Sequence, residues 1–165
     1  GEEYAASTPF QFFSSHPEPE LARATAEGRR AEFAEHGWSA DEVPDPQDPE
    51  TFARSKLDWG EVDSGEHARL RRLYRDLIAL RRDDSDLADP WLEHLAVDYD
   101  EDHGWIAVAR GRLRIVCNLG AGPARVPISG DVVLAWGDPA VGADGTVLQG
   151  HSFAILSVPQ RPVDN

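Results

Sequence analysis

The hydrophobic pattern of the chain changes its period near residues 83–92. Before this junction, apolar side chains recur every three or four residues, whereas after it short apolar runs alternate with polar residues between Gly, Pro and Asp. One element cannot satisfy both periods, because side chains three or four apart share a helix face and side chains two apart share a strand face. The sequence therefore predicts a helix-and-loop part over residues 1–85 and a β-sheet part over residues 86–165.

Two helices are predicted in the first part, at residues 19–35 and 67–82. The first has Pro at its start and Gly37 after its end, and its thin apolar face indicates a surface helix. The second carries a continuous apolar stripe that we expect to be buried. The stripe consists of Leu70, Leu73, Tyr74, Leu77 and Ile78. Between the two helices, Asp48 is placed to cap a short helix that begins at Pro49.

The second part has the pattern of a series of strands joined by tight turns. The predicted strands cover residues 93–99, 104–110, 112–119, 124–129, 131–136, 146–148 and 152–158. Short strands with turn signals at regular intervals are typical of an antiparallel sandwich. Cys117 lies in the alternating run of Leu113, Ile115 and Leu119, and we interpret it as a small core residue rather than a nucleophile.

Charge and composition exclude several classes of function. The chain has 30 acidic and 16 basic side chains among 165 residues, so its formal net charge is −14, and we expect neither nucleic acid nor an anionic membrane as a partner. Its apolar runs are far shorter than the ~20 residues of a membrane span. The single Cys forms no intrachain disulfide, which favours a cytoplasmic protein. The six His residues lack zinc-ligand spacing and the glycines form no phosphate loop, so we expect no metal and no cofactor.

The adjacent carboxylates Glu2 and Glu3 are the first candidates for chemistry. Neighbouring residues on a strand point to opposite faces, so at most one of these side chains can face a pocket. The pair is therefore not by itself an acid–base dyad. A solvated or helix-capping role is an equally good interpretation.

Aromatic side chains crowd the beginning of the chain, at Tyr4, Phe10, Phe12 and Phe13. Flat apolar rings bind the apolar faces of sugars, and polar neighbours bind the hydroxyl groups. Core packing is the alternative for each of these residues. Trp38 is either the lip of a cleft or the cover of a helix joint, and the sequence does not separate these interpretations.

Several segments of the chain form a family pattern. They are residues 1–13 (GEEYAASTPFQFF), 28–33 (GRRAEF), 43–49 (VPDPQDP), 55–59 (SKLDW) and 73–81 (LYRDLIALR). Together they resemble the C-terminal portion of the malto-oligosyltrehalose trehalohydrolases, a family of α-amylase-type glycoside hydrolases. The opening GEE stretch and the PDPQDP loop are specific to this family, whereas the last helix is generic for the superfamily.

The resemblance implies an α+β fold for the chain as a fragment. Residues 1–85 would be the C-terminal end of a catalytic (β/α)8 barrel, mostly the loop and helices after strand eight. Residues 86–165 would be the C-terminal antiparallel β-sandwich domain. A complete barrel needs about 250 residues. Because the chain is shorter and contains no Met, we expect it to be a portion of a longer protein.

For the intact family, the resemblance implies hydrolysis of the α-1,4 bond next to the terminal trehalose of maltooligosyl trehalose. The partner is thus a malto-oligosaccharide-type substrate. Such enzymes are retaining and use paired carboxylates, which lie on earlier barrel strands. The resemblance therefore places no catalytic residue in this chain, and we expect the chain alone to be inactive. It implies substrate-binding loop positions only, namely Glu2, Glu3, Tyr4, Phe10, Phe12 and Trp38.

Two alternatives stay open at this stage. In one, the β-sheet part is an independent carbohydrate-binding or interaction module, with Trp91, Trp105 or Trp136 exposed for stacking on glucan. In the other, the chain is part of a glycogen branching or debranching enzyme. We also expect self-association, because apolar side chains that face the barrel strands lose their cover in this chain.

Overall fold

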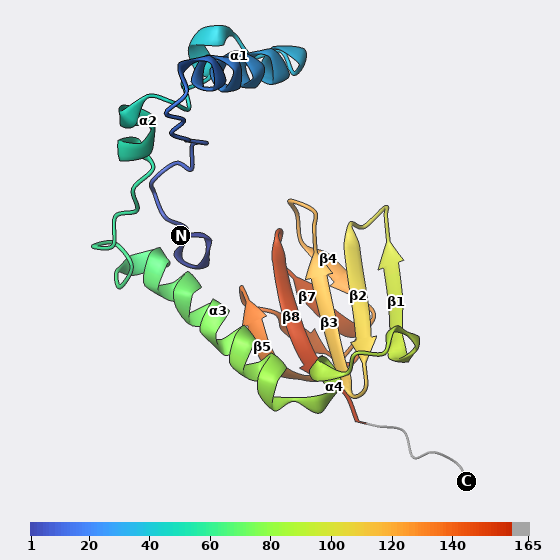
Figure 1. Ribbon diagram of the computed structural model, residues 1–165. Coiled ribbons are helices and arrows are strands. Elements are labelled where there is room, and N and C mark those ends of the chain that lie inside the picture. Colours follow the sequence, from blue (N-terminus) through green and yellow to red (C-terminus); the bar gives the residue numbers. More distant parts are fainter. Residues whose placement is uncertain (160–165) are drawn as a thin grey trace. The chain divides into compact units, whose positions relative to one another are not determined.

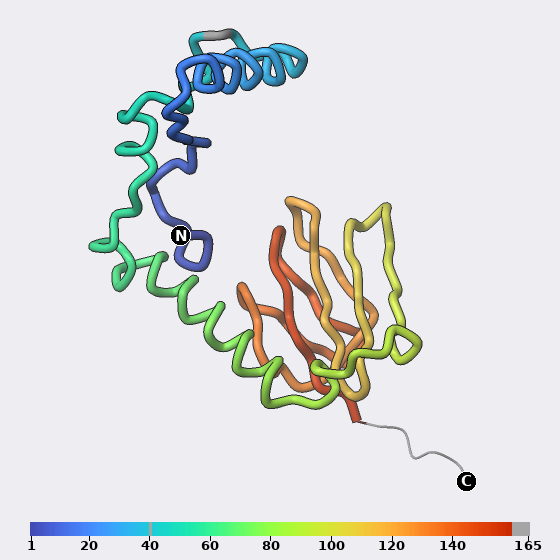
Figure 2. Tube along the Cα trace, in the orientation of Figure 1, coloured from blue at the N-terminus to red at the C-terminus, as the bar shows by residue number. Residues whose placement is uncertain are grey.

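The computed structural model describes residues 1–159, except for the side chain of Ala40, and its chain divides into two compact units (Figures 1 and 2). The first unit covers Gly1–Arg72 and the second begins at Leu73. Helix α3 (Gly65–Asp83) includes residues of both units. The predicted order of a helical part before a β part is confirmed, whereas the domain boundary at residue 85 stays a prediction.

Short helices and loops make up the first unit. These are η1 (Glu2–Tyr4), α1 (Pro19–Glu35), η2 (Ala40–Glu42), α2 (Pro49–Arg54) and the start of α3. The bounds of α1 confirm the prediction, and Gly37 follows its C-cap with a φ of +83°. The predicted cap of α2 is also confirmed, since an Asp48 carboxylate oxygen accepts a hydrogen bond of 2.9 Å from the backbone N–H of Glu50.

The second unit contains two antiparallel sheets (Figure 1). After α4 (Ser85–Ala88) and η3 (Leu92–His94), its strands are β1 (Leu95–Asp100), β2 (Trp105–Arg110), β3 (Leu113–Asn118), β4 (Ala124–Val126), β5 (Asp131–Trp136), β6 (Ala140–Gly142), β7 (Gly145–Leu148) and β8 (Ser152–Ser157). The larger sheet has the order β1-β2-β3-β8-β5 and the smaller has the order β4-β7-β6. The predicted antiparallel sandwich is confirmed. Strand β6 and helix α4 were not predicted, because three or four residues are too few to establish a period.

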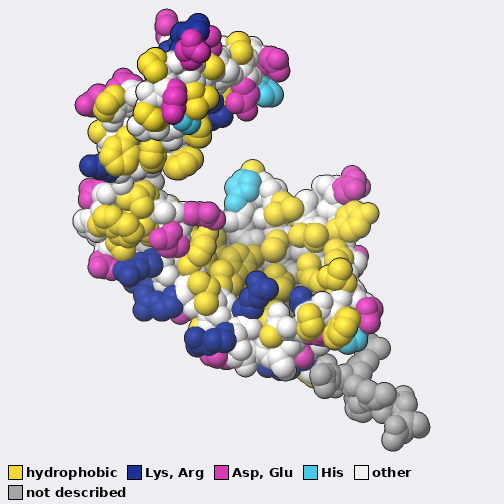
Figure 3. All heavy atoms as spheres, in the orientation of Figure 1, with side chains coloured by type: hydrophobic (Ala, Val, Ile, Leu, Met, Phe, Trp, Pro, Cys, Tyr) yellow, Lys and Arg dark blue, Asp and Glu magenta, His cyan; other side chains and the backbone are white. Residues whose placement is uncertain are grey.

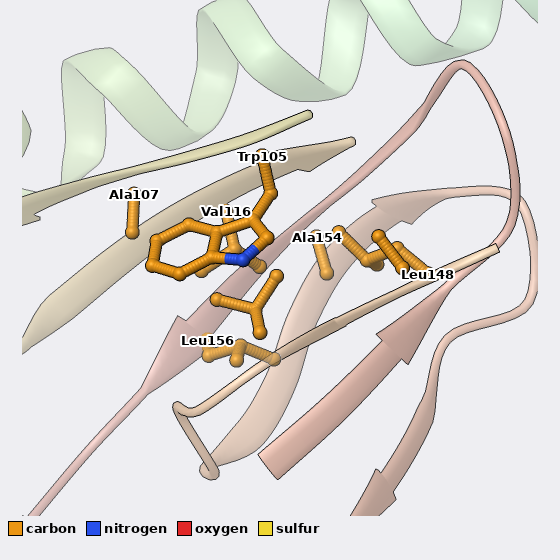
Figure 4. Packing of buried hydrophobic residues seen from close by; sticks show 8 residues of the cluster. Trp105, Ala107, Val116, Leu148, Ala154 and Leu156 are labelled. Carbon is orange, nitrogen blue, oxygen red and sulfur yellow. The ribbon is translucent and has the colours of Figure 1, made fainter. Parts of the chain in front are cut away.

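The hydrophobic core of this unit lies between the two sheets (Figure 4). Its members are Trp105, Ala107, Val116, Ala124, Val126, Leu148, Ala154 and Leu156. Ala107, Val116 and Ala154 are directly opposite one another on β2, β3 and β8, so their side chains share the inner face of the larger sheet. This core therefore uses one face of each central strand, although Leu113 of β3 and Ile155 of β8 are also buried on the opposite face.

The outer face of the larger sheet is also apolar. Its register aligns two rows across five strands, Tyr99, Ile106, Cys117, Phe153 and Trp136 in one and Val97, Val108, Ile115, Ile155 and Leu134 in the other. Hydrophobic side chains accordingly gather over this face in Figure 3. The interpretation of Cys117 as a core residue is wrong, because the thiol lies on the outer face, whereas Val116 is the β3 residue that packs between the two sheets. Burial raises the pKa of the Cys117 thiol.

Helices α3 and α4 partly cover this outer face. Leu77 and Leu80 of α3 and Leu87 of α4 line a cavity of about 500 Å³ together with Phe153 and Ile155 of β8. The expectation of a buried stripe on α3 is nevertheless wrong: none of the described residues of this helix is fully buried. Periodicity determines which side chains share a face, but burial requires a partner that fills the space against that face.

A junction clamp, formed by Asp84, Asp86 and Arg112, connects α4 to the turn between β2 and β3. Asp84 is 9% exposed and caps α4 by accepting a hydrogen bond of 3.0 Å from the Asp86 N–H. The Arg112 guanidinium donates to Asp84 at 2.6 Å, and the Arg112 backbone N–H donates to the Asp86 carboxylate at 2.8 Å. The clamp thus lies at the point where the chain changes from helical to β structure.

Candidate functional site

The first residues of the chain form a single tight turn. Glu2 and Glu3 are exposed on η1. The Ala6 N–H donates to the Gly1 carbonyl at 2.8 Å, and Ala5 closes the turn in the left-handed region with a φ of 52°. The two carboxylates therefore lie on a 3-10 turn, whereas a strand was expected from the sequence.

Tyr4 is the buried residue of this turn and is only 1% exposed. Its ring centroid lies 6.0 Å from that of Trp59 and 6.4 Å from that of His67. The His67 Nδ1 lies 2.8 Å from the Tyr4 carbonyl oxygen and donates to it when protonated. Burial raises the pKa of the Tyr4 hydroxyl. Tyr4 thus connects the turn to α3, and its role as a sugar contact stays a prediction.

Glu61 binds Ser7, which follows the opening turn. Its carboxylate accepts a hydrogen bond of 2.8 Å from the Ser7 N–H and another of 2.7 Å from the Ser7 hydroxyl. Hydrogen bonds to the ionised form stabilise it, so the Ser7 hydroxyl and N–H lower the pKa of Glu61. The His67 Nε2 lies 3.8 Å from the same carboxylate. These contacts orient the chain that leads into the aromatic stretch.

Three of the predicted substrate-binding residues come together around one hollow of the first unit. Phe10, Phe12 and Trp38 are 89%, 44% and 51% exposed. They line a cavity of about 290 Å³, here named the aromatic cavity. Its lining consists of Pro9, Phe10, Gln11, Phe12, Arg29, Phe33, Trp38, Glu42, Val43 and Pro44. Hydrophobic side chains also reach the surface of this unit in Figure 3.

Two charged groups stand among the rings of the aromatic cavity. The Arg29 guanidinium lies 5.1 Å from the ring centroid of Phe12 and 4.4 Å from that of Phe33, within cation–π range. The Glu42 Oε2 accepts hydrogen bonds of 2.8 Å from both the N–H and the hydroxyl of Ser39. Those bonds lower the pKa of Glu42, so the cavity contains a fixed anion and a fixed cation at neutral pH.

A second cavity of about 560 Å³ lies beside the opening turn. Glu2, Phe10 and Phe13 are among its lining residues, and Glu3 is not. Phe13 packs edge-on against Phe52 of α2, with ring centroids 5.0 Å apart. The structure thus places Phe10 at both cavities. The sugar-binding roles of Glu2 and Glu3 stay predictions.

Sequence reasoning did not select Arg29, Phe33 or Glu42. Arg29 and Phe33 lie in the GRRAEF segment of α1, whose spacing of four residues places both side chains on one helix face. That spacing was the available signal, but only the fold brings this face of α1 to the aromatic stretch at the start of the chain.

Within residues 1–159, no group of three or more His, Cys, Asp and Glu residues is arranged to hold a metal ion. Among the helices described there, none is long and apolar enough to cross a membrane.

The three Trp residues of the second unit occupy different environments. Trp105 is 7% exposed and belongs to the sandwich core (Figure 4). Trp136 is half-buried on the outer face of the larger sheet, and Trp91, just before η3, is 60% exposed. They do not form one exposed aromatic face of the kind that the glucan-binding module requires.

A family model and several curated relatives match this chain. The model of a domain of unknown function, DUF3459, matches residues 90–155. A malto-oligosyltrehalose trehalohydrolase of Mycobacterium tuberculosis is 64% identical over 156 residues, which are 94% of this chain and 27% of that protein. The enzyme of the same name from Arthrobacter ramosus is 53% identical over 94% of this chain and 26% of its own length. The one from Rhizobium sp. is 51% identical over 90% of this chain and 25% of its own length. The chain therefore spans about a quarter of these relatives.

Solved structures agree with these matches. A putative α-amylase from Salmonella typhimurium superposes with a TM-score of 0.75 at 34% identity, over 96% of this chain and 27% of its own. The trehalulose synthase MutB superposes with a TM-score of 0.55 at 18% identity, over 96% of this chain and 35% of its own, which is a likeness of fold alone. The architecture is thus that of a part of α-amylase-type enzymes.

Proposed function

We infer the function from the family of the chain. The chain is a C-terminal portion of the malto-oligosyltrehalose trehalohydrolases, which belong to the α-amylase-type glycoside hydrolases. We propose that the intact protein hydrolyses the α-1,4 bond next to the terminal trehalose of maltooligosyl trehalose and releases trehalose. The observation that carries this proposal is the 64% identity over 94% of the chain. It includes the helical unit as well as the sandwich, so it supports more than a shared accessory domain.

The chemical step in this proposal belongs to residues outside the chain. A retaining glycosidase needs a nucleophile and an acid–base carboxyl group about 5 Å apart across the glycosidic bond. Glu2 and Glu3 are neighbours on one exposed turn, so they are poor candidates for that pair. We propose that this chain instead supplies sugar contacts through Phe10, Phe12 and Trp38, which surround the aromatic cavity.

The second unit has a structural role in this proposal. Its larger sheet is apolar on both faces, and the outer face is only partly covered by α3 and α4. We propose that the remainder of the parent protein packs against this face, and that the isolated chain self-associates through it. Of the three Trp residues of this unit, Trp91 is the exposed one and favours the competing module hypothesis. The lone Cys is compatible with a cytoplasmic enzyme, where thiols stay reduced.

The proposal is tested with a chimera. This chain replaces the matching segment of the Mycobacterium tuberculosis trehalohydrolase, and trehalose release from maltooligosyl trehalose is measured. We expect the chimera to keep activity within about tenfold of the relative, a difference of about 1.4 kcal/mol. The isolated chain should release no trehalose. A matched control chimera carries the corresponding segment of MutB, which shares the fold, and should be inactive.

Two outcomes would contradict the proposal. Turnover by the pure isolated chain would show that the essential carboxylates lie within it. A chimera with native-like circular dichroism but no trehalose release would refute the assignment to this reaction. Branching of soluble starch by the same chimera would favour the glycogen branching alternative.

A further inference from the structure

The aromatic cavity exposes apolar rings to water, which forgoes the free energy of hydrophobic burial unless a ligand covers them. Phe10 is 89% exposed, although a solvated benzyl side chain gives up the hydrophobic stabilisation of burial. Trp38 is 51% exposed and is held edge-on against Phe33, with ring centroids 5.4 Å apart. The hollow between them measures about 290 Å³, at the lower end of the range for small-molecule sites. It therefore suits a compact ligand that meets aromatic surface on more than one side.

The polar groups of the cavity are already held in place. Arg29 is stacked on Phe12 and Phe33, and its Nη1 donates to Glu32 at 3.1 Å. A guanidinium has five N–H donors, so this ion pair leaves further donors for a ligand. The two hydrogen bonds from Ser39 to Glu42 end on Oε2, and an ionised carboxylate has further acceptor positions on its other oxygen. Because these side chains are ordered before binding, little conformational entropy is lost when a ligand engages them.

The charged groups of the aromatic cavity limit the class of ligand that it can bind. Arg29 is neutralised by Glu32, and Glu42 adds a second anion within a chain of net charge −14, so an anionic ligand is disfavoured. A purely apolar ligand would remove water from the remaining polar atoms of the Glu42 carboxylate and the Arg29 guanidinium without replacing its hydrogen bonds. A neutral ligand with apolar faces and a rim of hydroxyl groups meets both conditions. A hexose ring has this character, since its C–H faces stack on aromatic rings while its hydroxyls donate to carboxylates and accept from guanidinium groups.

We propose that the aromatic cavity is a binding site for one glucosyl unit of a malto-oligosaccharide, with Phe10 and Trp38 as stacking surfaces and Arg29 and Glu42 as hydroxyl-binding groups. The choice of glucose in α-1,4 linkage rests on the proposed function, whereas the choice of a neutral sugar rests on the cavity itself. This site lies in the helical unit. It therefore differs from the module hypothesis, which places sugar binding on the sandwich.

The test uses the isolated chain, the indole N–H signals of its Trp residues in two-dimensional NMR, and maltotetraose as the probe. We expect the Trp38 signal to shift saturably at millimolar maltotetraose, while the Trp91 signal stays in place. Phe10→Ala should weaken binding about 3- to 10-fold, as expected for loss of an aromatic stacking partner. Because Phe10 is 89% exposed, this variant should keep the wild-type spectrum elsewhere.

Matched variants and ligands make the outcome decisive. Trp91→Ala removes a Trp of the other unit whose exposure is similar to that of Trp38, and it should leave the affinity for maltotetraose unchanged. Arg29→Lys should weaken binding, because a point charge replaces the planar donor. Cellotetraose, with β-linked glucose, should bind more weakly than maltotetraose. A Trp38 signal that does not move, or equal weakening by Trp91→Ala and Phe10→Ala, would overturn the site. Equal binding of both tetrasaccharides would overturn the α-glucan assignment.

Failure of this inference is distinguishable from failure of the proposed function. Binding is read on the isolated chain, and trehalose release is read on the chimera. An active chimera combined with an unmoved Trp38 signal would refute the sugar site alone. Saturable binding combined with an inactive, folded chimera would refute the reaction alone.

Discussion

Replacement of Asp84 tests whether the junction clamp stabilises the β unit. Asp84→Ala removes two contacts at once: the cap on the Asp86 N–H at 3.0 Å and the ion pair with Arg112 at 2.6 Å. Loss of an N-cap costs about 1 kcal/mol, and a hydrogen bond to a charged group contributes about 1.5–3 kcal/mol. The Arg112 side chain is 44% exposed and regains water in the variant, so the lower value applies. We therefore expect a loss of about 2.5 kcal/mol in the free energy of unfolding.

Asp84→Asn separates the two contributions. Asn is as good an N-cap as Asp, so this variant keeps the cap and loses mainly the charge opposite Arg112. We expect it to lose about 1 kcal/mol. In a double-mutant cycle, Asp84→Asn combined with Arg112→Ala should show a coupling of about 1 kcal/mol, because the two side chains interact directly.

Urea unfolding measures these differences, followed by Trp fluorescence in a Trp38→Phe/Trp59→Phe background. The remaining Trp residues all belong to the unit that begins at Leu73, so the transition reports on the part of the chain that contains the clamp. Equal destabilisation by Asp84→Ala and Asp84→Asn would refute the capping role. A coupling below about 0.3 kcal/mol, within the usual limits of additivity, would refute the ion-pair role.

Two further predictions concern a glycine and a titrating carboxylate. Gly111→Ala should destabilise the β unit by at least about 1–2 kcal/mol in urea unfolding, because Gly111 has a φ of +52° and an added Cβ would overlap the Asp86 carboxylate of α4. The control Gly122→Ala places its Cβ in open space, so its free energy of unfolding should stay within about 0.5 kcal/mol of the wild-type value. Because its folded-state pKa is lowered, Glu61 contributes stability above its unfolded pKa of about 4.3, and this stability is lost as the pH falls through the folded value. In a carboxyl ¹³C NMR titration, Ser7→Ala removes the hydroxyl donor but keeps the backbone N–H, so it should raise the Glu61 pKa part of the way toward its ordinary value; an unchanged pKa would show that the Ser7 hydroxyl is not a cause of the shift.

Local signals in the sequence were sufficient for most of the elements. Pro19 and Gly37 mark the ends of α1, and Asp48 caps α2, because capping depends on residues within a few positions of the helix end. Alternation and turns located seven of the eight strands that lie within residues 1–159. The sequence had no comparable signal for β6, at residues 140–142, since its pairing with β7 exists only in the folded sheet.

The candidate site was partly accessible to the same reasoning. Crowded aromatic residues at the start of the chain indicated Phe10 and Phe12, which line the aromatic cavity. Arg29 and Glu42 were not found, because they come from α1 and η2 and meet the aromatic stretch only after the loops fold back. Tyr4 belongs to the same stretch in sequence, yet it is buried, because Trp59 and His67, which are distant in the sequence, pack close to its ring in the folded unit.

The sequence by itself determined the change from helix to strand near residues 83–92, because the two hydrophobic periods depend only on local backbone geometry. The tertiary structure decided which face of each element is buried. In β3, Ile115 and Cys117 alternate as well as any core residues, but Val116 is the residue that packs between the sheets. Val116 shares its face with Arg114 and Asn118, so alternation alone favours the opposite face; the choice depends on which distant element covers each face.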